Sequence, residues 1–167
     1  MLKLGDIQEA EKKVLGDIGQ LLATVRALSD ATESLQDGAA RLRQIRTAVY
    51  ENLNQIQHEH LIIRALAWLR GHGFGEPHVE WYWNPRQTGD SSEPDLQARD
   101  AIQVIASAEA TTSEEPDGVI DSRMRDTVIK LNRMAGRRFY FVQTDSMAQR
   151  ARTKVLKNSL DIEVVRL

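Results

Sequence analysis

Two acidic residues stand where neighbouring strands could bring them together. Asp95 follows Pro94 at the start of one strand-like segment, and Glu109 lies near the end of the next. Carboxylates at the ends of adjacent strands can hold one hard cation such as Mg²⁺, which prefers oxygen ligands and keeps several waters. A cation held in this way binds a phosphate group and activates a water molecule. The pair therefore predicts a Mg²⁺ site with Asp95 and Glu109 as its ligands.

Each acid also has a structural interpretation. Asp95 comes directly after a proline, a position at which aspartate often starts a turn. Glu109 ends an otherwise apolar strand, where a carboxylate needs a partner, a metal, or a place at the wet end of the strand. The sequence favours the functional interpretation for both residues and leaves the structural one open.

The elements that would position these acids form an α/β pattern after residue 77. Trp81 and Trp83 alternate with polar neighbours and should share a buried face. The segment from Ala101 to Ala110 is apolar on nearly both faces and should be a central strand. The predicted strands are 78–83, 94–98, 101–110, 138–142 and 161–165, with helices over 121–135, capped at Asp121, and 147–156.

The first third of the chain has a different period. Apolar residues recur every seven positions, which predicts a coiled coil over residues 1–57 that joins chains, most simply as a dimer. Leu15 and Leu22 widen this apolar stripe, and Ser29 or Asp30 could cap a new helix, so a hairpin within one chain is the alternative. The α/β domain would then be 58–167. The repeating positions are Ile7, Val14, Leu21, Leu28, Leu35, Leu42, Val49 and Ile56.

The order of elements carries a resemblance. A helix, three strands, a helix and a strand, with Pro94-Asp95 opening the second strand and Glu109 on the third, resembles the PD-(D/E)XK nuclease superfamily over residues 52–167. The resemblance implies a restriction-endonuclease-like mixed sheet flanked by helices. It also implies that Asp95 and Glu109 bind divalent metal, and that a lysine two residues after the second acid helps to activate water. At that position this chain has Thr111.

Three interpretations of this departure remain open. Lys130, on the helix that follows, could supply the missing lysine, as in some members of the superfamily. Thr111, or Gln103 or Ser107 on the same strand, could suffice beside the metal. In the third interpretation catalysis is lost and the fold is kept for binding or assembly. The superfamily also often places a further carboxylate on the helix before the sheet; Glu59 has that position, although an exposed helical acid is the simpler interpretation.

The charges are segregated along the chain. The formal net charge is only −2, yet residues 88–117 hold eight acids and one arginine, and residues 121–157 hold ten basic residues and three acids. A basic face beside an acidic pocket suits DNA, whose affinity comes largely from phosphate contacts. Ordinary solvated helix faces are the alternative. The candidate DNA-binding residues are Arg123, Arg133, Arg150, Arg152 and Lys154.

The sequence does not support a disulfide-bonded, membrane-spanning, secreted or zinc-binding protein. The chain has no cysteine, so disulfides and thiolate metal sites are excluded. No apolar run reaches the roughly 18 residues of a membrane span, and no secretion signal opens the chain, so a cytoplasmic location is expected. His58 and His60 do not share a helix face and cannot form a helical zinc pair.

The sequence thus predicts a Mg²⁺-dependent DNA endonuclease with catalytic residues Asp95, Glu109 and Lys130, dimerised by its coiled coil. The alternative is an inactive nuclease-fold protein for binding or assembly, whose coiled coil recruits a partner.

Overall fold

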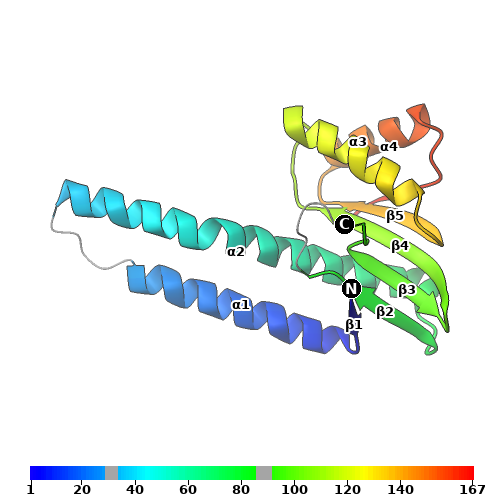
Figure 1. Ribbon diagram of the computed structural model, residues 1–167, viewed down its shortest axis with the longest axis horizontal. Coiled ribbons are helices and arrows are strands. Elements are labelled where there is room, and N and C mark those ends of the chain that lie inside the picture. The colour runs from blue at the N-terminus through cyan, green and yellow to red at the C-terminus, as the bar shows by residue number, and fades with distance from the viewer. Residues whose placement is uncertain (29–33, 86–91) are drawn as a thin grey trace.

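The protein is a mixed α/β structure built on one twisted sheet (Figure 1). The computed structural model describes residues 1–28, 34–85 and 92–167. In these ranges the strands run in chain order across the sheet, as β1 (Leu2–Leu4), β2 (Val79–Trp83), β3 (Leu96–Asp100), β4 (Gln103–Thr111), β5 (Arg137–Val142) and β6 (Glu163–Arg166). The helices are α1 (Ile7–Leu28), α2 (Leu35–Leu69), with a short π-helical continuation (Arg70–Phe74), α3 (Gly118–Asn132) and α4 (Asp145–Lys157).

The sheet changes from antiparallel to parallel at its centre. Strands β1 to β4 pair antiparallel, whereas β4, β5 and β6 are parallel. The two parallel pairs require crossover helices, and α3 and α4 supply them on one face of the sheet. The end of α2 and the start of α1 cover the other face (Figure 1). The carboxyl ends of β4 and β5 therefore lie side by side, where ligand sites of α/β sheets usually form.

Side-chain alternation divides β4 between two cores. Ala106, Ala108 and Ala110 pack in the larger core with α1 and α2. The intervening Ser107 and Glu109 point to the opposite face, toward α3. Trp81 and Trp83 are buried in the larger core, as their alternation predicted.

The N-terminal helices form a hairpin, not a continuous rod. Helices α1 and α2 lie side by side and project from the sheet (Figure 1). The described N-cap of α2 is Ser34, whose hydroxyl accepts the backbone N–H of Asp37 at 3.1 Å. The predicted caps Ser29 and Asp30 lie outside the described residues.

Two features of the N-terminal third differ from the heptad interpretation. Residues 2–4 form β1 at the edge of the sheet, whereas the heptad prediction included them in the coiled coil over residues 1–57. Helix α2 runs without a break from Leu35 to Leu69, so the boundary predicted between residues 57 and 58 falls inside it. The described helices include none that is long and apolar enough to cross a membrane.

Helix α3 begins one turn earlier than predicted. Its N-cap is Asp117, which has extended backbone angles, and the prediction that Asp121 caps the helix is wrong. The turn between α3 and β5 contains Gly136, which has a φ of +77°. An ideal Cβ there would lie 2.5 Å from the carbonyl carbon of Ile105, so only glycine fits this close approach to β4.

Candidate functional site

Asp95 is buried immediately before β3, with 1 % of its surface exposed. Its Oδ2 accepts a hydrogen bond from the backbone N–H of Ala110 on β4 at 2.8 Å. The carboxylate is therefore held against the neighbouring strand. Because Leu96 pairs with Ala108, the antiparallel register continues by one step to bring Asp95 opposite Glu109.

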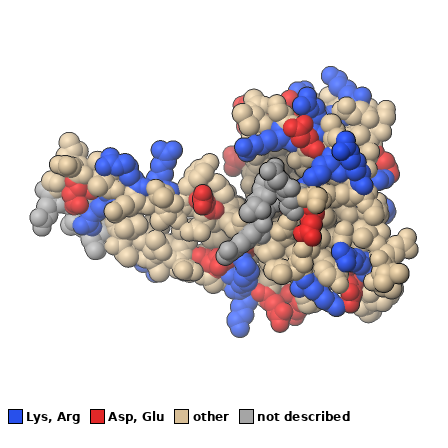
Figure 2. All heavy atoms as spheres, in the orientation of Figure 1, with Lys and Arg blue, Asp and Glu red and all other residues tan. Residues whose placement is uncertain are grey.

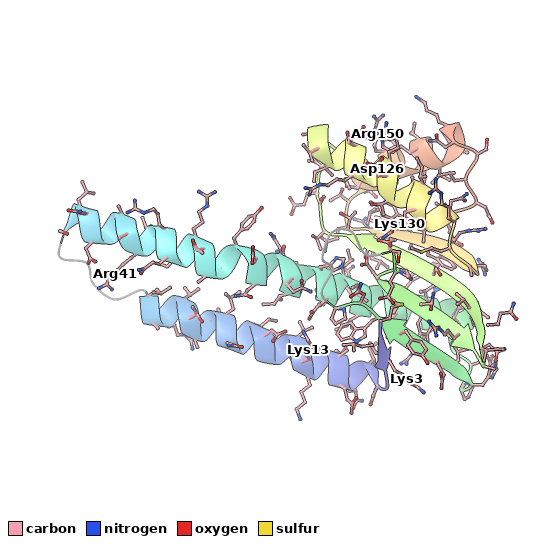
Figure 3. All side chains as sticks on the ribbon, in the orientation of Figure 1. Lys3, Lys13, Arg41, Asp126, Lys130 and Arg150 are labelled. Atoms are coloured by element: carbon pink, nitrogen blue, oxygen red, sulfur yellow. The ribbon has the colours of Figure 1, made fainter. Side chains whose placement is uncertain are left out.

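Glu109 is 2 % exposed and forms an ion pair with α3. The Nζ of Lys130 lies 2.6 Å from Glu109 Oε1. Figure 3 shows Lys130 between α3 and the sheet. The structure thus brings together Asp95, Glu109 and Lys130, the three residues that the sequence nominated for catalysis.

Tyr140 belongs to the same cluster and was missed by the sequence argument. It is the register partner of Glu109 across the parallel β4–β5 pair and is buried. Burial and then the charges of Glu109 and Asp95 raise the pKa of the Tyr140 hydroxyl well above its usual value, although a hydrogen bond with Thr111 acts the other way. The Tyr140 hydroxyl therefore stays protonated at neutral pH.

His58 is the second residue that the sequence argument missed. Its Nε2 lies 3.3 Å from Asp95 Oδ1. Burial lowers the pKa of His58, but the hydrogen bond and charge of Asp95, with the charges of Glu109 and Glu59, outweigh it and raise the pKa above the ordinary 6.5. A signal was present in the sequence: His58 begins the helix face that continues through the buried Ile62 and Leu66.

Glu59 is fully buried, so its interpretation as an exposed acid is wrong. The Nζ of Lys13 on α1 lies 2.6 Å from its Oε2, and the side-chain amide of Gln55 donates to its Oε1 at 3.0 Å. Burial of a carboxylate requires such partners. Glu59 thus anchors α1 to α2 next to His58 instead of facing solvent.

An open pocket of about 650 Å³ lies over this cluster, between α3 and the ends of β4 and β5. Glu109, Lys130 and Tyr140 line one part of it, and Arg123 adds a second cation. The exposed carboxylate of Asp126 and the neutral groups of Thr111, Ser113 and Thr127 complete the polar lining. The charged lining is thus two carboxylates, one of them buried, and two cations that can bind an anionic oxygen group.

The donor set of the site fits a hard cation. Asp95 and Glu109 offer carboxylate oxygens from adjacent strands, and water can complete the coordination of Mg²⁺. Within residues 1–28, 34–85 and 92–167, no cluster of three or more His, Asp or Glu side chains is arranged as a metal site.

The five candidate DNA-binding residues occupy two different environments. Arg123 lines the main pocket, and Arg133 lines a smaller hollow beside it that also includes Lys130. The other three are engaged within the fold. Arg150 and Lys154 pair with Asp121, at 2.6 and 2.8 Å, and Arg152 donates to the carbonyl of Val164 at 3.3 Å.

The ion pairs of Asp121 join α3 to α4, and they predict that this contact stabilises the fold in a pH-dependent way. The hydrogen bonds from Arg150 and Lys154 hold the pKa of Asp121 well below its usual range. A carboxyl whose pKa is depressed by folding adds stability that is complete above its unfolded pKa of about 4 and is lost as the pH falls below it. Asp121→Asn should therefore lower the urea midpoint at pH 7, and the difference from wild type should shrink as the pH drops below about 4.

The matched control for this prediction is Asp126→Asn. Asp126 lies on the same helix, is exposed, and forms an ion pair with its neighbour Arg125. We expect no comparable change in midpoint for it, because exposed pairs contribute little. If the difference in urea midpoint between Asp121→Asn and wild type stayed constant down to pH 3, the ionised carboxylate of Asp121 would not be the source of the stabilisation.

No protein-family model, curated protein or solved structure matches this chain. The site must therefore be interpreted from its own residues.

Proposed function

We propose that this protein is a divalent-metal-dependent endonuclease that hydrolyses DNA phosphodiesters. The observation that carries the proposal is the 2.6 Å contact between Lys130 Nζ and Glu109 Oε1, with Asp95, just before β3, opposite Glu109 in the strand register. Two carboxylates and a lysine are the constellation implied by the resemblance to the PD-(D/E)XK superfamily. The lysine here comes from α3, because Thr111 occupies its usual position.

The order of elements supports the same proposal. Helix α2 is followed by the antiparallel strands β2, β3 and β4, then by α3 and the parallel strand β5. Asp95 directly precedes the second of these three strands, and Glu109 lies on the third. This succession, with an acid before the second strand and another on the third, supports the proposal because the resemblance to the nuclease superfamily implies the same order.

In this proposal Asp95 and Glu109 hold Mg²⁺, which when bound supplies Lewis acidity and a water of lowered pKa. The Lys130 ammonium, 2.6 Å from Glu109 Oε1, would hold and orient a water molecule beside the phosphate by donating a hydrogen bond to it. Arg123, across the same pocket, offers a guanidinium to a phosphate oxygen. Tyr140 stays protonated and can donate a hydrogen bond into the site.

His58 and the backbone N–H of Ala110 have a positioning role in this mechanism. They bind the two oxygens of Asp95, at 3.3 and 2.8 Å, and so fix the plane of its carboxylate. Partners of this kind orient ligands and tune their basicity.

A second candidate function is binding or assembly by a catalytically inactive nuclease fold. Two observations favour it: Thr111 stands where the superfamily has its lysine, and three of the five candidate DNA-binding residues are engaged inside the fold. In this alternative the pocket binds a phosphodiester group without hydrolysing it.

Cleavage of supercoiled plasmid and of a linear duplex by the full chain tests the proposal. We expect nicked or linear product with Mg²⁺ or Mn²⁺ and none with EDTA. Titration of Mn²⁺ by calorimetry gives a readout of the site that does not depend on turnover. Absence of cleavage with any divalent ion would overturn the enzymatic proposal, and salt-sensitive DNA binding without cleavage would favour the second candidate.

A further inference from the structure

Two arginines along α3 stand on opposite sides of Lys130. Arg123 lies seven residues before Lys130, and Arg133 three residues after it, so all three lie on one face of the helix. Arg133 is the C-cap and keeps helical backbone angles. At a rise of 1.5 Å per residue, the three cations spread over about 15 Å of the helix axis. Figure 2 shows basic side chains along this side of the domain, with acidic groups among them.

Two hollows follow one another along this face and meet at Lys130. The main pocket, of about 650 Å³, includes Arg123, and the smaller hollow, of about 420 Å³, includes Arg133. Lys130 and Asp126 line both of them. Both volumes lie in the range of about 300–1,000 Å³ that small ligands occupy, so each hollow can take a nucleotide. A strand with its scissile phosphate at Lys130 therefore has room on both sides of that phosphate.

The fold does not neutralise these two arginines. Lys130 pairs with Glu109 at 2.6 Å, and Arg125 pairs with Asp126 at 3.3 Å. In the described part of the chain, no carboxylate forms an ion pair with either of the two arginines, and both are exposed. Asp126 is the opposing charge, because it lies between the arginines and repels a phosphate placed beside it. The favourable positions for phosphates on this face are therefore at its two ends.

We propose that one strand of the DNA substrate lies along α3, with the scissile phosphate at Lys130 and its neighbours bound by Arg123 on one side and Arg133 on the other. A strand that ended at the site would fill one hollow only, whereas an internal phosphodiester fills both. The substrate is thus a polynucleotide with nucleotides on both sides of the bond that is cut. This inference rests on the proposed function for the identity of the ligand, and it assigns Arg133 a role in holding the strand.

Binding of a thymidine tetranucleotide by the full chain tests this placement, because its three linkages provide one phosphate for each cation. The measurement is made in EDTA, where the proposed function predicts no cleavage, so a failure of the nuclease activity does not affect it. Arg123→Gln and Arg133→Gln should each raise the dissociation constant at least about threefold at low salt, and the double variant by about the product of the two. Each lost phosphate contact should also reduce the slope of log K against log salt by about 0.7.

Two further variants control for charge. Lys157→Gln removes an exposed cation at the end of α4 and should leave the dissociation constant within about twofold of wild type. Asp126→Asn removes the acid that lines both hollows and should tighten binding at least about twofold at low salt. Equal weakening by Lys157→Gln and Arg133→Gln, or no tightening by Asp126→Asn, would overturn the placement in favour of unspecific attraction.

A neutral linkage identifies the phosphate that each arginine binds. A methylphosphonate carries no charge, so replacing the first or the last linkage of the tetranucleotide should weaken its binding to the wild-type chain at least about threefold. We expect Arg123→Gln to become insensitive to the replacement at one end of the tetranucleotide, and Arg133→Gln to the replacement at the other end. Loss of sensitivity at the same end in both variants, or a wild-type chain that responds to neither replacement, would overturn the inference even if the protein cleaves DNA.

Discussion

Asp95→Asn and Glu109→Gln should each reduce Mg²⁺-dependent cleavage by about 10³-fold or more. A metal ion contributes several kcal/mol to the transition state of phosphodiester hydrolysis, and each 1.36 kcal/mol corresponds to tenfold in rate. Both substitutions remove a charged ligand and keep the shape of the side chain. Asparagine at position 95 also retains a carbonyl that can accept the N–H of Ala110, which Asp95 Oδ2 accepts at 2.8 Å.

Stability and metal affinity separate a chemical defect from unfolding in these variants. We expect lower urea midpoints, because each change removes one partner of an ion pair, but chains that remain folded in the cleavage assay, which contains no denaturant. Mn²⁺ binding by calorimetry should weaken in parallel with cleavage. Glu163→Gln is the matched control, since Glu163 is an exposed acid paired with Arg137 away from the pocket. Full cleavage by Asp95→Asn or Glu109→Gln would show that these acids do not hold the metal.

Lys130→Met should reduce cleavage by about 10²-fold or more, and a lysine at position 111 should restore part of the loss. A positioned acid or base typically contributes 10²–10⁴-fold. Methionine keeps most of the length of the side chain and removes the ammonium that lies 2.6 Å from Glu109. The same substitution should lower the urea midpoint, because it leaves Glu109 buried without this cation.

The rescue distinguishes a catalytic from a structural lysine. Thr111 and Lys130 line the same pocket, and Thr111 lies two residues after Glu109. Lys130→Met combined with Thr111→Lys should therefore regain both stability and cleavage. Recovery of the urea midpoint without any recovery of cleavage would mean that Lys130 only neutralises Glu109. Lys157→Met, at the exposed end of α4, serves as the control for loss of one positive charge.

Local patterns were sufficient to predict the elements of the α/β region. The alternation at Trp81 and Trp83 and the apolar run ending at Glu109 placed two strands close to β2 and β4. The α3 boundary was missed because Asp117 and Asp121 are both plausible caps, and tertiary contacts with Arg150 engage Asp121 instead. Strand β1 was missed because three residues carry no period, and its pairing with β2 depends on residues about 80 positions away.

The sequence by itself determined the α/β class, the two buried acids as candidates, and three possible answers to the missing lysine. It could do so because strand alternation and the position of Asp95 after Pro94 are local properties of the chain. Only the tertiary structure decided that Lys130 contacts Glu109, that His58 contacts Asp95, and that the N-terminal helices fold back on each other. Those contacts join residues far apart in the chain, and their geometry depends on how helices pack against the sheet, which no local spacing encodes.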